Sequence, residues 1–317
     1  MTDIVAIDIG GTHARFAPAE VEGGRVISLG ETCTLRTSDY PGLAEAWEEF
    51  CGRAGAPRAS GAAIAFAGPV GGETLKLTNN EWVIRPATIA EELGLSRCRI
   101  VNDFGAVAHA VAHLPPSELR HLFGPDQPLP QEGLISIVGP GTGLGVAMLL
   151  RQSGRNHVIE TEGAHTDFGP VDEVEDRILA FLRGPFGRVS VERVVSGAGL
   201  ANIHEALGNR RREEKELWTD ALAGSDSAAA ASLERFCLSL GSAMGDLALA
   251  QGASAVVVAG GLGLRIADHL PRSGFYSRFT AKGRYRGMME AMPIKLITHP
   301  QPGLYGAAAA FAERFSA

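Results

Sequence analysis

The sequence predicts an α/β protein of two domains. Its 317 residues exceed a typical single domain, so two domains are expected. Short apolar runs typical of strands occur between segments with helical spacing. Both halves open with the same unit, a strand, a glycine-rich turn and a returning strand, at residues 4–17 and again at 134–150. The repetition of this unit indicates that each half builds its own sheet.

The first half begins as strands and then becomes helical. Its expected antiparallel strands are residues 3–9, 14–20 and 25–35, and its buried strands are 61–66 and 99–101. A helix is expected from Tyr40 to about Arg53, because Leu43, Trp47 and Phe50 recur at helical spacing. The prolines after Leu114 break the pattern and mark a domain boundary there.

The second half repeats the order of strands followed by helices. Its expected strands are residues 134–138, 146–150, 157–161, 254–259 and 294–298. Its expected helices are 171–183, 191–200, 228–251 and 303–315. A strand that ends in glycines before a helix, at Gly260-Gly261, offers a place where backbone can lie flat against a nucleotide.

Charge and cysteine content exclude several classes of protein. A net charge of −7 argues against general affinity for nucleic acid or anionic membranes. The four cysteines form no close pair, which favours reduced thiols in the cytoplasm over a disulfide framework or a zinc site. The N-terminus lacks a signal-peptide pattern, and no apolar stretch is long enough to span a bilayer.

The turn Asp8–Thr12 is a candidate phosphate site. Glycines enter positive-φ regions at little cost, and a turn without side chains exposes N–H groups that bind anions. Thr12 adds a hydroxyl, and Asp8 adds a carboxylate for a hydrated cation. Most Gly-Gly pairs are only turns, so the motif alone is weak evidence. The matching turn at 139–145 strengthens it, because two such turns can grip one polyphosphate from both sides.

Asn102 and Asp103 stand where a strand ends and a helix begins. Either residue would serve as a helix N-cap. A carboxylate at the carboxyl end of a strand also suits a ligand cleft. Because a cap needs only one residue, the pair favours a functional role.

Two further polar segments are candidates for holding a sugar. Residues 75–82 combine polar side chains with Trp82, although an ordinary polar turn with a core Trp is the favoured interpretation. Residues 162–170 place Glu162, His165 and Asp167 close together. This segment has too few ligands for a metal site, and Glu162 with His165 suits vicinal hydroxyls.

Taken in order, the motifs resemble those of the ATP-dependent bacterial glucokinases, in the superfamily of actin, the hexokinases and the chaperone ATPases. The seven motifs are Asp8–Thr12, Leu77–Asn79 with Trp82, Asn102–Phe104, Gly141–Gly145, Glu162–His165, Glu192–Gly197 and Gly260-Gly261. Each is poorly specific alone, but the ordered set spans nearly the whole chain. Ala164 and His13 depart from the family pattern, where Gly and Asn are common.

The resemblance implies the overall organisation. An actin/hexokinase-like (ribonuclease H-like) fold of two α/β domains around a cleft is expected, with residues 1–113 and 300–317 in the small domain and 114–299 in the large one. ATP and Mg²⁺ are the implied cofactors, without the zinc cluster of the related repressor–kinase family. A cytoplasmic homodimer is expected.

The resemblance also implies a role for each candidate residue in phosphorylating glucose to glucose 6-phosphate, the entry step of glycolysis. Asp103 would be the general base. Sugar contacts would come from Asn102, Asp103, Glu162, His165 and Glu192, with Asn79 as a weaker candidate. Nucleotide contacts would come from Asp8, Ile9, Gly10, Gly11, Thr12, Gly141, Thr142, Gly143, Gly260 and Gly261. Asp8 would hold Mg²⁺ mostly through water.

Alternatives remain open at the level of the sequence. A kinase for another hexose or an N-acetylhexosamine would use the same motifs. An ATPase or acyl-phosphate kinase should lack the polar cluster that suits a neutral polyol. A non-catalytic sugar sensor would have little need of Asp103 together with three glycine turns.

Overall fold

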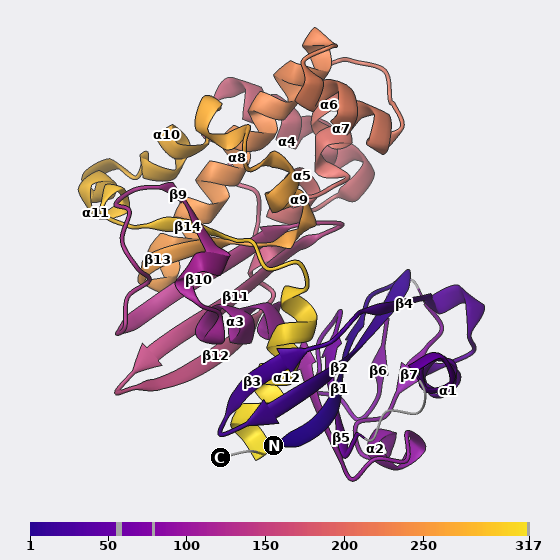
Figure 1. Cartoon of the computed structure of the whole chain (residues 1–317). Helices are drawn as coiled ribbons and strands as arrows, with labels where there is room; N and C mark the ends of the chain where they lie inside the picture. Colours follow the sequence, from indigo (N-terminus) through magenta and orange to yellow (C-terminus); the bar gives the residue numbers. More distant parts are fainter. Residues whose placement is uncertain (55–58, 78–79, 316–317) are drawn as a thin grey trace. The chain divides into compact units, whose positions relative to one another are not determined.

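The computed structural model describes residues 1–54, 59–77 and 80–315. The chain divides into two compact units, Met1–Pro115 with His299–Ala317, and Pro116–Thr298. The predicted boundaries, 113/114 and 299/300, differ from these by two residues and one. Each unit contains its own mixed sheet and helices, which is the predicted α/β class (Figure 1).

Six strands form the main sheet in the described part of unit 1. Its elements are β1 (Thr2–Ile9), β2 (His13–Glu22), β3 (Arg25–Leu29), β4 (Cys33–Arg36), α1 (Leu43–Ala54), β5 (Gly61–Phe66), β6 (Leu75–Lys76), β7 (Val83–Ile84), α2 (Ile89–Glu92), β8 (Arg97–Asn102), α3 (Asp103–His113) and α12 (Pro302–Phe315). The strand order is β3-β2-β1-β5-β8, and β4 pairs with β2 outside this order. Strand β2 pairs antiparallel with β1, β3 and β4, whereas β1, β5 and β8 are parallel.

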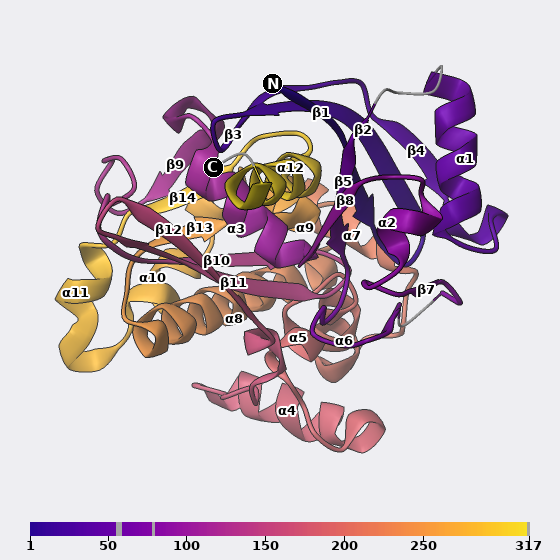
Figure 2. The same cartoon turned by 90° about the horizontal axis from the view of Figure 1, so that it is seen from below.

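Both faces of this sheet are buried, because helices cover each of them. Val5 and Ile7 of β1 pack toward α1, and the alternate residues Ile4 and Ala6 pack toward α12. Figure 2 shows α3 and α12 on one face and α1 and α2 on the other. Helices α3 and α12 approach closely at Gly306, where an added Cβ would lie 1.7 Å from the carbonyl oxygen of Ala106.

Unit 2 is built around a sheet of order β12-β11-β10-β13-β14-β9. Its elements are β9 (Leu119–Phe123), β10 (Gly133–Pro140), β11 (Leu144–Gln152), β12 (Arg155–Thr161), a 3₁₀ turn η3 (Gly163–His165), α4 (Glu173–Phe186), α5 (Val191–Val194), α6 (Gly199–Ala206), α7 (Glu214–Ala223), α8 (Ser227–Gln251), β13 (Ala253–Val258), α9 (Gly260–Ile266), α10 (Phe275–Thr280), α11 (Arg286–Glu290) and β14 (Ile294–Ile297). Helices α4, α6, α7 and α8 gather on one side of it, as Figure 1 shows.

The predicted third strand, residues 25–35, is wrong as a single strand. It is divided into β3 and β4, which pair with opposite ends of β2. Pro18 stands between the two paired regions and has no N–H to continue the ladder. Its carbonyl oxygen instead accepts the N–H of Gly30 at 2.8 Å, at the break between β3 and β4.

The predicted helix 191–200 is also interrupted. Helix α5 ends at Val194, and α6 begins only at Gly199. The chain turns so tightly that a Cβ on Gly199 would lie 2.1 Å from the carbonyl oxygen of Val194. The residues in the break make the contacts with the second glycine turn described below. Strand β9, antiparallel to β14, had no sequence prediction.

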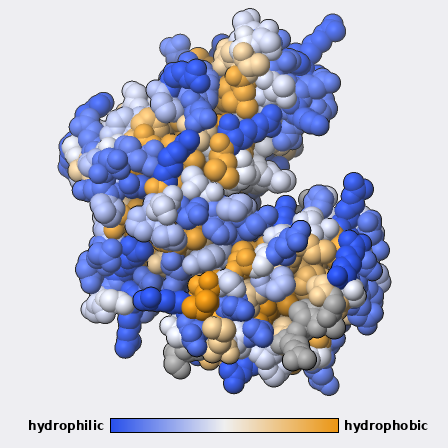
Figure 3. Space-filling model, viewed as in Figure 1, coloured by the Kyte–Doolittle hydropathy of each residue, from blue (hydrophilic) through white to orange (hydrophobic). Residues whose placement is uncertain are grey.

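Several large apolar side chains of the described residues are exposed. Exposed examples such as Ile27, Phe181 and Met288 lie on separate elements. Hydrophilic residues cover much of the face drawn in Figure 3. Among the helices of the described ranges, none combines the length and apolar character needed to cross a bilayer.

Candidate active site

The candidate base Asp103 is held at the first turn of α3 by its neighbour. Asn102 is the N-cap, and its Oδ1 accepts hydrogen bonds from the N–H groups of Phe104 at 2.9 Å and Gly105 at 3.1 Å. Its Nδ2 donates to the carbonyl of Gly68 at 3.1 Å. The Asp103 carboxylate accepts from Phe104 N–H at 2.8 Å. Asn102 is therefore the N-cap of α3, and the Asp103 carboxylate shares one of the capped N–H groups, that of Phe104.

The first glycine turn joins β1 to β2 and is braced by Thr37. Gly10 N–H donates to the carbonyl of His13 at 2.9 Å, and Thr37 binds the carbonyls of Gly11 and Thr12, each at 3.1 Å. The expectation that Gly10 and Gly11 need positive φ is wrong, because neither is among the positive-φ glycines of the described residues. A Cβ on Gly10 would meet only the His13 carbonyl oxygen within 4 Å. The space beside the turn suits a ligand that approaches the backbone.

Asp8 lies at the end of β1 opposite Arg15 of β2. The guanidinium Nη1 is 3.3 Å from Asp8 Oδ2. Burial raises the pKa of Asp8, and the Arg15 charge opposes that rise. The Ile9 side chain is buried in the core, so only its backbone is available to a ligand. The sequence analysis did not name Arg15 as a site residue, although a hairpin that turns at residues 10–13 pairs residue 8 with residue 15.

The Asp8 carboxylate fits a site for Mg²⁺ carried by a nucleotide. Mg²⁺ that is bound with phosphates keeps several waters and needs only one or two carboxylates. Asp8 supplies one carboxylate beside the first glycine turn and meets that requirement. A Cβ on Gly303, in the first turn of α12, would lie 3.3 Å from this carboxyl group, so glycine leaves room there.

The second glycine turn joins β10 to β11 and is closed by its own backbone. Gly141 N–H donates to the carbonyl of Gly143 at 2.8 Å, and the Gly141 carbonyl accepts from Gly197 N–H at 2.7 Å. Thr142 is exposed between them. A Cβ on Gly141 would meet nothing within 4 Å, so this side of the turn is also open.

Gly260 and Gly261 begin α9 directly against this second turn. Gly260 has φ of +78°, and a Cβ there would lie 2.5 Å from the carbonyl oxygen of Pro140. Glycine is therefore required at 260 by both conformation and space. A Cβ on Gly261 would meet nothing within 4 Å.

The loop after β12 carries Glu162 and His165 on its exposed side. Their side chains are 58% and 54% exposed, and His165 Nε2 lies 3.8 Å from Glu162 Oε2. Thr166 Oγ1 donates to the carbonyl of Gly163 at 2.9 Å and fixes the 3₁₀ turn. The Ala164 methyl group, which departs from the family pattern, is buried in the core of unit 2. It therefore does not occupy the exposed side of the loop, where the side chains of Glu162 and His165 lie.

Glu192 contacts the second glycine turn. Its Oε2 accepts a hydrogen bond from the N–H of Leu144 at 3.0 Å, immediately after Gly143. The sequence reasoning gave this residue a sugar role and did not foresee the contact. The residue is in the first turn of α5, which directs its side chain toward the turn between β10 and β11.

The segment around Trp82 divides into described and undescribed parts. Asn79 lies outside the described residues. Trp82 is 1% exposed, and its indole N–H donates to the carbonyl of Tyr40 at 2.9 Å. The interpretation of Trp82 as a core residue is confirmed.

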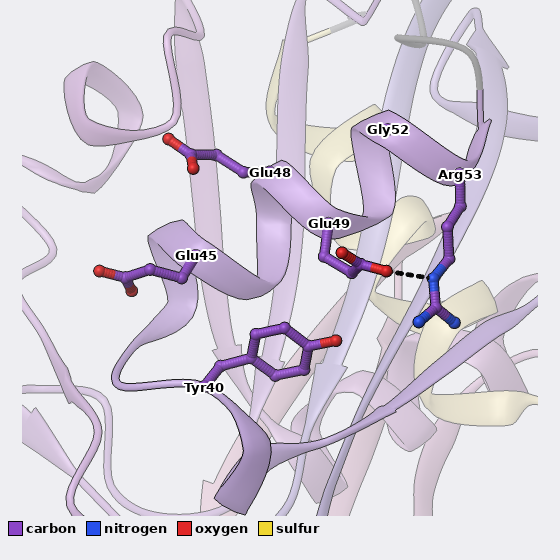
Figure 4. Close-up of a pocket in the computed structure, with 6 residues that line it drawn as sticks. All are labelled: Tyr40, Glu45, Glu48, Glu49, Gly52 and Arg53. Carbon is purple, nitrogen blue, oxygen red and sulfur yellow. Dashed lines mark hydrogen bonds and ion pairs between the residues drawn. The ribbon is translucent and has the colours of Figure 1, made fainter.

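A pocket of about 460 Å³ beside α1 contains none of the predicted site residues. Figure 4 shows Glu45, Glu48 and Glu49 projecting from α1, with Glu49 Oε1 2.6 Å from Arg53 Nε. Tyr40, on the chain before α1, also lines the pocket. Three carboxylates disfavour a phosphate there, so this pocket does not compete with the glycine turns as a nucleotide site.

Comparison with known proteins identifies the family. The glucokinase family model matches residues 5–314. The glucokinase of Zymomonas mobilis is 59% identical over 99% of both chains, and that of Xanthomonas campestris pv. campestris strain B100 is 38% identical over 96% of this chain and 94% of its own. A crystal structure of a glucokinase from an Antarctic psychrotroph superposes with a TM-score of 0.84, at 29% identity and 98% coverage of each chain. The chain belongs to the glucokinase family.

Proposed function

We propose that this protein transfers the γ-phosphoryl group of ATP to the primary hydroxyl of glucose, forming glucose 6-phosphate and ADP. The observation that carries the proposal is the placement of Asp103. Its carboxylate stands at the junction of β8 and α3, while the cap of that helix is supplied by Asn102. A carboxylate fixed at the end of a strand is placed to accept the proton of a hydroxyl group that binds there.

The sugar is held by carboxylate, amide and imidazole groups. Glu162 and His165 present a carboxylate and an imidazole ring on the exposed side of one loop. Asn102, Asp103 and Glu192 contribute further polar atoms, and Asn79 is a weaker candidate outside the described residues. Buried or fixed polar groups discriminate strongly, because a sugar that lacks one hydroxyl leaves a partner unsatisfied.

The nucleotide is held mainly by backbone. Gly10, Gly11 and Thr12 in the first turn, and Gly141, Thr142 and Gly143 in the second, bind phosphates. Gly260 and Gly261 lie along the adenosine. Asp8 would hold Mg²⁺ mostly through water, and the ion would supply charge neutralisation for the phosphates. This proposal is supported by the open space beside the backbone at Gly10 and Gly141, which a side chain at either position would occupy.

In the proposed reaction, Asp103 accepts the proton of the primary hydroxyl while that oxygen bonds to the γ-phosphorus. The bond from the γ-phosphorus to the β,γ-bridging oxygen breaks, and ADP leaves. Positioning and charge stabilisation supply most of the acceleration in such transfers. Asn102 contributes by fixing the start of α3, which sets the position of the base.

We further propose that the protein acts in the cytoplasm, as a homodimer, at the entry to glycolysis. All four cysteines, Cys33, Cys51, Cys98 and Cys237, are free thiols. Burial raises the pKa of Cys98 and Cys237 to about 12, which makes both thiols unreactive at neutral pH.

A panel of acceptors tests the function. The purified protein, MgATP and one acceptor at a time are assayed for ADP formation, with glucose, fructose, mannose, N-acetylglucosamine, acetate and no acceptor. The expected result is the highest kcat/KM with glucose and little turnover with acetate. Preference for another hexose would assign the alternative kinase, and ATP binding without turnover on any sugar would assign a sensor.

A further inference from the structure

Glu192 supports the second glycine turn from one side. Its Oε2 accepts the Leu144 N–H at 3.0 Å, and the same oxygen would lie 2.5 Å from a Cβ at Gly143. The carboxylate therefore occupies the space that the missing side chain of Gly143 leaves. A hydrogen bond to a charged acceptor is stronger than one to a neutral acceptor. Replacing the carboxylate with a neutral group should therefore weaken the support of the turn.

The segment that carries Glu192 is bonded to both halves of the site in unit 2. Val191 N–H donates to the carbonyl of Thr166, in the loop after Glu162 and His165, at 2.9 Å. At its other end, Gly197 N–H donates to the carbonyl of Gly141 at 2.7 Å. The Gly197 carbonyl accepts from the buried indole N–H of Trp218 at 2.9 Å, which anchors the segment to α7.

We propose that Glu192 is a positioning residue for the phosphate-binding turn, and that residues 191–197 couple the sugar loop to that turn. The inference rests on the proposed function, since it assumes that this turn binds phosphate. A Glu192 carboxylate that moves to meet a sugar also alters its bond to Leu144. Coupling of this kind is reciprocal, so sugar and nucleotide each change the affinity for the other.

Nucleotide affinity measured without sugar separates this role from simple sugar binding. Isothermal titration with a non-hydrolysable ATP analogue and Mg²⁺ is expected to give about tenfold weaker binding for Glu192→Gln than for wild type. Glu132→Gln is the matched control, because Glu132 accepts the backbone N–H of Ser153 at 3.0 Å in a turn at the other end of β11. That variant should bind the analogue as wild type does.

The possible outcomes distinguish this proposal from the function on which it rests. Wild-type affinity in Glu192→Gln would overturn the positioning role while leaving the kinase assignment intact. If wild type itself failed to bind the analogue, the proposed function would fail. An unchanged thermal midpoint of unfolding in Glu192→Gln is expected, which shows that the loss is local to the turn.

A double-mutant cycle tests the contact itself. The methyl group of Gly143→Ala would collide with Glu192 Oε2, so this variant should weaken analogue binding in the wild-type background. In a Glu192→Ala background the collision is absent, and adding Gly143→Ala should cost less than threefold in affinity. Additive effects of the two substitutions would show that the carboxylate and the turn act independently, contrary to the proposal.

Discussion

The carboxylate of Asp8 and the guanidinium of Arg15 face each other across the β1–β2 ladder, with Oδ2 3.3 Å from Nη1. Burial raises the pKa of Asp8, whereas the positive charge and hydrogen bond of Arg15 lower it. Only the ionised carboxylate suits Mg²⁺ and its waters. Arg15 therefore lowers the pH at which Asp8 becomes competent for the proposed metal role, against the effect of burial.

The Arg15→Gln variant should lose activity at a higher pH than wild type does. Without the guanidinium, the effect of burial on Asp8 is no longer opposed and its pKa rises further. The carboxylate is therefore protonated at a higher pH than in wild type. The acid limb of the kcat/KM profile for MgATP should therefore move to higher pH. Arg25→Gln, an exposed arginine of the same sheet, is the control. Superimposable profiles for Arg15→Gln and wild type would remove Arg15 from this role.

The Asp103→Asn variant should lose at least about two orders of magnitude in kcat, the usual scale for loss of a general base. Glucose binding should be largely kept, because the amide has nearly the same shape. Stability should change little, since Asn102 and not Asp103 caps α3.

The same substitution at Asp176, in the first turn of α4, provides a matched control with normal kcat. Rates come from a coupled assay at saturating substrates, and glucose Kd comes from titration. A near-normal kcat in Asp103→Asn would mean that another group accepts the proton.

The sequence predicted most strands and helices because the spacing of apolar residues that indicates them lies within short stretches of the chain. Apolar runs such as residues 61–66 match β5, and the spacing of Leu43, Trp47 and Phe50 matches α1. The errors have tertiary causes. Pro18 on one strand interrupts the pairing of another, and the tight approach of Gly199 to Val194 ends a helix that the pattern would continue.

The candidate site was predictable in residue type but not in contacts. The strand-to-helix junction at residues 102–103 and the two glycine turns were visible in the sequence. The bond from Leu144 N–H to Glu192, 48 residues away, has no local signature. The glycines at 10 and 141 do not need positive φ, so open space and not conformation explains them.

The Glu162→Gln variant should weaken glucose binding by roughly tenfold, because a neutral amide replaces a charged acceptor for a sugar hydroxyl. The carboxylate that bonds to the glycine turn is that of Glu192, whereas the Glu162 side chain is 58% exposed. ATP-analogue affinity without sugar should therefore stay at the wild-type value. Glu173→Gln, an exposed glutamate at the start of α4, controls for the loss of one charge. An unchanged glucose Kd would exclude Glu162 from hydroxyl binding.

Glu313 of α12 joins two histidines of α3, the helix that begins with the candidate base. Its Oε2 is 3.0 Å from His109 Nδ1, and its Oε1 is 2.5 Å from His113 Nε2. Burial acts to raise the pKa of Glu313, but the two histidines outweigh burial and lower it from 4.5 to about 2. A depressed pKa in the folded state stabilises the protein above pH 4.5, and this contribution is lost as pH falls from 4.5 toward 2.

Glu313→Gln should therefore reduce the free energy of unfolding at pH 5 and should flatten its decline below pH 4.5. Urea unfolding at pH 6, 5, 4 and 3 measures both effects. Glu290→Gln removes one partner of an exposed pair with Arg286, 3.6 Å apart, and should change the curve little. Parallel pH curves for Glu313→Gln and wild type would contradict the assignment. Because the histidines lie on the second and last turns of α3, far along the helix from Asp103, kcat for the folded variant at neutral pH should stay within a few-fold of wild type.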